Sequence, residues 1–115
     1  MRNSWEVVAE LESDNSRLFK EAVIAKEAEA GNTEFFAGCR LAFDAMITFG
    51  VKKVPERTGT DGAGYSWHAF NTNLQKLITR ETTGNAARDL IEDIMDHCTN
   101  EQWNGWYRRI LIKDL

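Results

Sequence analysis

The sequence predicts an all-α domain: a compact bundle of about six helices with one long loop that is rich in basic residues and glycine. Apolar residues recur at three-and-four spacing along most of the chain, which is typical of helices. No stretch alternates convincingly with the period of two that a strand requires. The chain has a single proline, which argues against a turn-rich β-sandwich. Its 115 residues suit one domain, 1–115, with one hydrophobic core.

The first two predicted helices, residues 5–12 and 15–30, carry the acidity of the protein. Gly31 and Asn32 end the second of them. Eight acids and four bases fall within residues 1–34, whereas the rest of the chain has ten of each. The formal net charge of −4 therefore arises in the first third, and a basic face can exist elsewhere on the molecule.

The third predicted helix covers residues 34–49. Thr33 is expected to cap its start and Gly50 to end it. Apolar side chains lie nearly all round this segment, which is typical of a central and largely buried helix.

A long loop follows, beginning with the basic residues Lys52 and Lys53. This part is expected to be extended, because the residue before Pro55 avoids the helical region. The stretch 58–64 holds three glycines and is expected to be mobile.

Three more helices are predicted in the second half. They are 67–79, which Ser66 can cap, then 85–98, and a last helix that begins at the capping box Thr99-x-x-Gln102. Mutual burial of the apolar stripes should form one core. The expected core residues are Phe43, Met46, Leu74, Ile78, Ile91, Ile94, Trp106 and Ile110.

Enzyme and metal motifs are missing from the sequence. The two histidines and two cysteines lack the paired spacing of a zinc site, and both cysteines extend apolar stripes, where a buried thiol is usual. Neither G-x-x-x-x-G-K-[ST] nor G-x-G-x-x-G is present. No apolar run is long enough to span a membrane, and the N-terminus lacks a secretory signal. We therefore expect a cytoplasmic monomer with no catalytic residue, no metal ligand and no membrane partner.

One turn carries a pattern with functional meaning. Thr83-Gly84-Asn85-Ala86 lies at the N-terminus of the helix 85–98, where backbone N–H groups lack helical acceptors. Such amides lie at the positive end of the helix dipole and can bind a phosphate. Arg88, one turn into the helix, and Arg80, before the turn, would add positive charge. A plain helix–turn–helix connection capped by Thr83 explains the same residues.

Four stretches together resemble the N-terminal α-helical DNA-binding domain of phage-type ATP-dependent DNA ligases. Residues 35–55 look like its central helix running into a Lys-Lys-x-x-Pro loop, and 66–80 look like the helix before its DNA-contacting turn. Thr83-Gly84-Asn85-Ala86-Ala87 is similar to that turn, and 108–115 look like the helix that leads to the catalytic core. The resemblance covers roughly residues 5–115 in order and spacing.

The resemblance implies a DNA-holding role in replication and repair. Such a domain grips duplex DNA on both sides of a nick, mainly through the minor groove and the phosphates. The implied DNA-contacting residues are Thr83, Gly84, Asn85 and Ala86 in the turn, with Lys52 and Lys53 in a second loop. Arg88 and Arg80 join this candidate site through their charge.

The same resemblance implies what the chain does not do alone. It contains no Lys-x-Asp-Gly adenylation motif, so we expect it to be non-catalytic and to need no cofactor. ATP and Mg²⁺ are implied for the parent ligase. The expected partners are double-stranded or nicked DNA and the ligase's own catalytic domains, in a phage-infected cell or nucleoid.

Two other functions remain open on the sequence. A helical protein–protein adaptor would use the acidic helices and the four tryptophans as its partner face. A sequence-specific helix-turn-helix regulator would need a helix that reads bases. The exposed face of 85–98 is mostly Asp and Glu after Arg88, which would repel DNA.

Overall fold

The computed structural model describes residues 2–115 and confirms the all-α class, with no strand in that range. Five separate helices come first: α1 (Ser4–Glu12), α2 (Arg17–Glu29), α3 (Thr33–Phe43), α4 (Trp67–Ile78) and α5 (Gly84–His97). A sixth helical stretch closes the chain and consists of α6 (Asn100–Gln102), the π-helical turn η1 (Trp103–Tyr107) and α7 (Arg108–Leu111). None of the described helices is both long and apolar enough to cross a membrane.

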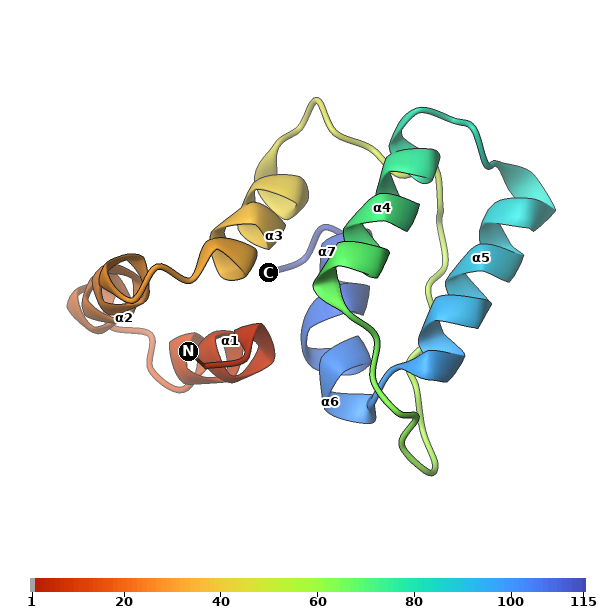
Figure 1. The fold of residues 1–115 in the computed structure, drawn as a ribbon. Helices are drawn as coiled ribbons and strands as arrows, with labels where there is room; N and C mark the ends of the chain where they lie inside the picture. Colours follow the sequence, from red (N-terminus) through yellow and green to blue (C-terminus); the bar gives the residue numbers. More distant parts are fainter. Residues whose placement is uncertain (1) are drawn as a thin grey trace.

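The C-terminal stretch is the centre of the fold. It lies between the α1–α3 group and the α4–α5 pair (Figure 1), and it contacts both α1 and α3. On its other side, the Phe70 ring of α4 stacks on Tyr107 with a centroid distance of 3.9 Å. Trp106 packs against α3 at Gly38, where a Cβ would overlap the indole ring. One core thus joins both groups of helices.

Most of the predicted core is confirmed. Five of the eight expected residues are 3% exposed or less, and Ile78 packs half-buried against them. The five are Leu74, Ile91, Ile94, Trp106 and Ile110.

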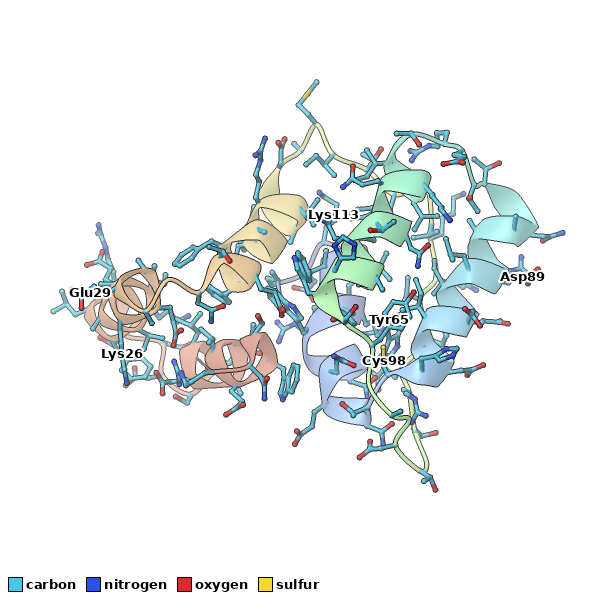
Figure 2. All side chains as sticks on the ribbon, viewed as in Figure 1. Lys26, Glu29, Tyr65, Asp89, Cys98 and Lys113 are labelled. Carbon is cyan, nitrogen blue, oxygen red and sulfur yellow. The ribbon has the colours of Figure 1, made fainter. Side chains whose placement is uncertain are left out.

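Phe43 and Met46 were wrongly predicted as core, because α3 ends at Phe43 and not at residue 49. Phe43 is 64% exposed and Met46 is 91% exposed, whereas Phe49 is buried. The physical reason is partly local, because the Asp44 side chain accepts the Met46 N–H at 2.9 Å and so forms a turn just after the helix, and partly remote. The ammonium group of Lys113, labelled in Figure 2, donates hydrogen bonds to three carbonyl oxygens where the helix ends. These are the carbonyls of Leu41, Asp44 and Ile47, at 2.9, 2.9 and 2.8 Å.

Two of the predicted helix caps are confirmed and one is wrong. Ser66 accepts the Ala69 N–H, and Thr99 accepts the Gln102 N–H. Asn32, and not Thr33, caps α3 by accepting the N–H of the third helical residue, and Thr33 is the first residue of the helix.

The Asn32 side chain also donates to the buried carboxylate of Glu27, at 3.1 Å. Arg2 donates to the same carboxylate at 2.8 Å. Burial by itself would raise the pKa of Glu27, but these hydrogen bonds and the Arg2 charge outweigh it, and the pKa is lowered.

The glycine-rich loop is fastened to the end of α5, which does not fit the expected mobile segment. The N–H groups of Gly62 and Gly64 donate to the carbonyls of Cys98 and His97, at 3.0 and 2.8 Å. A Cβ at Gly62 would lie 2.7 Å from the Cys98 oxygen, so only glycine lets the loop approach this closely. The Arg57 guanidinium adds bonds to backbone carbonyls on both sides of this contact. The loop therefore acts as the C-terminal cap of α5.

Candidate functional site

A groove of about 470 Å³ opens between the start of the long loop and the N-terminal half of α5. We call it the cationic groove. It brings together four of the eight predicted site residues from two distant parts of the chain. Its lining residues are Gly50, Val51, Lys52, Lys53, Pro55, Gly84, Arg88, Ile91 and Glu92.

Buried neighbours hold the loop side of the cationic groove in place. Val54 is 5% exposed, and its carbonyl accepts a hydrogen bond from Arg108 at 2.7 Å. The next carbonyl, of Pro55, accepts the Trp103 indole N–H at 2.8 Å. These hydrogen bonds to the C-terminal stretch fix the loop backbone, while the side chains of Lys52 and Lys53 stay exposed.

The α5 side of the groove presents free backbone donors. Thr83 is extended (φ −140°) and makes no side-chain cap, so the predicted capping role of its hydroxyl is not seen. The first bond of the helix is from the Ala87 N–H to the Thr83 carbonyl, at 3.3 Å. The N–H groups of Gly84, Asn85 and Ala86 thus have no acceptor within residues 2–115. The first turn of α5 also holds no acid, so nothing there competes with an anion at the positive end of the dipole.

Gly84 is the member of the turn that lines the groove. It takes a left-handed conformation (φ +58°) with open space where a Cβ would stand. Thr83, Asn85 and Ala86 are exposed beside it. An anion in the groove can therefore approach the Gly84 backbone closely.

The bases of the groove make no ion pair within the described chain, unlike several arginines elsewhere. Lys52, Lys53 and Arg88 make no salt bridge within the described part of the chain, and Glu92 is the one carboxylate of the lining. Several bases elsewhere contact acids of the first two helices: Arg2 with Glu10 and Glu27, Arg17 with Glu21, and Arg109 with Glu12. The acidic excess of the first third is thus partly neutralised by arginines that lie away from the groove. Within the groove itself, positive charge dominates.

Arg80 does not line the cationic groove. Its guanidinium donates to the carbonyl of Leu77 at 2.7 Å, and to the carbonyl and hydroxyl of Thr48 at 3.1 and 2.8 Å. The structure thus places this predicted site residue against the loop and the end of α4.

Five residues of the groove lining were not among the predicted site residues: Gly50, Val51, Pro55, Ile91 and Glu92. Glu92 could have been found, because it lies four residues after Arg88 and hence on the same face of the helix. Gly50 and Ile91 give no such signal. Gly50 was expected only to end a helix, and Ile91 only to fill the core.

The described residues hold no cluster of metal ligands. No three His, Cys, Asp or Glu side chains within residues 2–115 gather to hold a metal. The two cysteines are poor nucleophiles, since burial raises the pKa of Cys39 to about 11 and that of Cys98 to about 12. With Glu92 as its one carboxylate, the cationic groove does not fit Mg²⁺ either, a cation that prefers several oxygen ligands.

The described part of the structure lacks the surfaces that a tryptophan-based adaptor or a base-reading regulator would need. Trp103 and Trp106 are fully buried, and Trp5 and Trp67 pack against the core, so the tryptophans form no partner face. Along α5 the exposed side chains beyond Arg88 are acidic except for His97 at the end of the helix; one of the acids, Asp89, lies at the outer edge of the helix in Figure 2. A row of carboxylates opposes insertion into the major groove of DNA.

Two solved structures match the chain over nearly its whole length. One, named "Pmar-Lig_PreS3", is 45% identical over 99% of this chain with a TM-score of 0.96. The other, named "Pmar-Lig_Pre.", is 45% identical over 100% with a TM-score of 0.97. The chain spans only about a quarter of the length of each, 26% and 27%. The syllable "Lig" in both names indicates ligase-related proteins. No protein-family model and no curated protein matches the chain.

Proposed function

We propose that this chain is the duplex-DNA-binding domain of an ATP-dependent DNA ligase, which grips the phosphates and minor groove around a nick. The observation that carries the proposal is the convergence of Lys52, Lys53, Arg88 and the free amide of Gly84, at the start of α5, on one groove. The likeness to two ligase-related structures along the whole chain supports it.

The chemistry of the groove suits the DNA backbone. Two ammonium groups, one guanidinium and unpaired N–H groups are all donors, and each favours an anionic oxygen. Phosphates are the same at every base pair, so binding should be independent of sequence. Three cations that each neutralise one phosphate would make log K fall against log salt with a slope of about −2.7.

The proposal assigns no chemical step to this chain. Adenylation and joining would belong to the other domains of the parent ligase, which would also bind ATP and Mg²⁺. The proteins of the two matching structures are about four times as long as the region they share with this chain, which leaves room for such domains.

Fluorescence anisotropy with labelled nicked and intact duplexes of several sequences tests the proposal. We expect weak binding to all of them, with affinities that are similar between sequences and fall with salt. Salt-insensitive binding, or a strong preference for one sequence, would contradict it. A covalent AMP adduct after incubation with labelled ATP and magnesium would contradict the non-catalytic part.

A further inference from the structure

We infer that Arg80 is a positioning residue of the cationic groove and not one of its phosphate ligands. Its guanidinium ties the loop that carries Lys52 and Lys53 to the turn that leads into α5. This inference rests on the proposed function, because it states how the two halves of the phosphate-binding groove are held together.

The hydrogen bonds of Arg80 join two segments that are distant in sequence. Thr48 precedes the lysine-bearing part of the loop by only a few residues, and both its carbonyl and its hydroxyl accept from the guanidinium. The Leu77 carbonyl, which also accepts from it, lies in the last turn of α4. Arg80 itself stands just before the turn that contains Gly84. One side chain therefore links the two walls of the groove at the end next to Thr48, in addition to the anchors at Val54 and Pro55.

The backbone adopts left-handed conformations at both Gly50 and Arg80, where the loop meets the guanidinium. Gly50 has a left-handed conformation (φ +69°), and a Cβ there would lie 3.0 Å from the Arg80 Cζ. The loop thus passes directly over the guanidinium. Arg80 is itself left-handed at φ 63°, one of two such non-glycine residues among those described. That conformation is unfavourable for a residue with a Cβ, and the hydrogen bonds of the side chain offset its cost.

A planar fork is needed for this geometry. The guanidinium directs fixed donors at three acceptors on two segments, whereas an ammonium group is a compact point charge. Arg80→Lys therefore keeps the charge and removes the hydrogen-bonded link between Thr48 and Leu77, which we call the clasp. A phosphate ligand acting by its charge would tolerate this change far better than a positioning residue would.

A double-mutant cycle separates the two roles. DNA affinity is measured at one low salt concentration for Arg80→Lys, in the natural chain and in a Lys52→Gln/Lys53→Gln background. We expect a loss of at least about threefold in the natural chain and less than about twofold in the double variant, because Arg80 acts through those lysines. Equal losses in both backgrounds, or no loss in the natural chain, would overturn the inference.

A matched control and a second readout complete the test. Arg40→Lys makes the same chemical change at an exposed arginine of α3 and should leave affinity unchanged. Amide ¹H–¹⁵N NMR spectra without DNA should show shifted Gly50, Lys52 and Lys53 signals in Arg80→Lys, with the rest of a folded spectrum retained. Unmoved signals would refute the clasp. Shifted signals in a chain that never binds DNA would instead keep the clasp and refute the proposed function.

Discussion

The strongest test of the cationic groove is the removal of its two lysines. Lys52→Gln and Lys53→Gln together delete two of the three cations that line it, and neither lysine makes an ion pair in the described chain. Each lost phosphate contact should reduce the salt slope by about 0.9, so the slope should become shallower by about 1.8. Between about 50 and about 200 mM salt, the natural chain should lose about twelvefold more affinity than the variant.

Charge-matched comparison makes this prediction specific. Lys20→Gln and Lys26→Gln remove the same charge from α2, on the opposite side of the molecule (Figure 1). Anisotropy titrations at four or five salt concentrations give both slopes. If the α2 variant changes the slope as much as the groove variant does, binding follows net charge alone and the groove is not the site.

Three further predictions concern the glycine turn, the end of α3 and the stability of the fold at acidic pH. Gly84→Val and Gly31→Val both strain a left-handed glycine in open space and should destabilise similarly, but only the Gly84 change should weaken DNA binding, roughly tenfold, by blocking the approach of a phosphate to the backbone N–H donors. Anisotropy and thermal melts of both variants check this. Lys113→Met should cost about 2 kcal/mol in urea unfolding, because three carbonyls lose a charged donor. Glu27 has a lowered pKa, so it contributes stability above its unfolded pKa and loses it as the pH falls through the folded one. Glu27→Gln should therefore be less stable at neutral pH, and its stability should fall less on acidification below about pH 4; parallel pH profiles would exclude this role.

Local sequence signals accounted for most of the helices and for the α5 side of the cationic groove. Apolar periodicity and two of the three predicted caps placed five helices to within a few residues, because both depend on neighbours along the chain. The glycine turn at the start of α5 follows from the same local rules, as does Arg88 one turn later.

Contacts between distant residues contributed to the differences between the predicted and the observed structure. Apolar periodicity within residues 34–49 predicts a helix that runs on past Phe43, but the structure ends it there with a local turn, in which Asp44 accepts the Met46 N–H, and with Lys113 from the far end of the chain. The fastening of the glycine loop depends likewise on carbonyls at the end of α5. Phe43 and Met46 were misplaced for this reason: their apolar character is visible in the sequence, but their exposure follows from where the Asp44 turn and Lys113 end the helix.

The sequence by itself therefore determined the helical class, the unequal distribution of charge and the anion-binding character of one turn. Only the tertiary structure decided that Lys52 and Lys53 face that turn across a single groove, while Arg80 lies against Thr48. The physical reason is that helix formation depends on residues three or four apart. The groove instead requires two segments about thirty residues apart to meet, and the loop side is held in place by bonds from Trp103 and Arg108 of the C-terminal stretch.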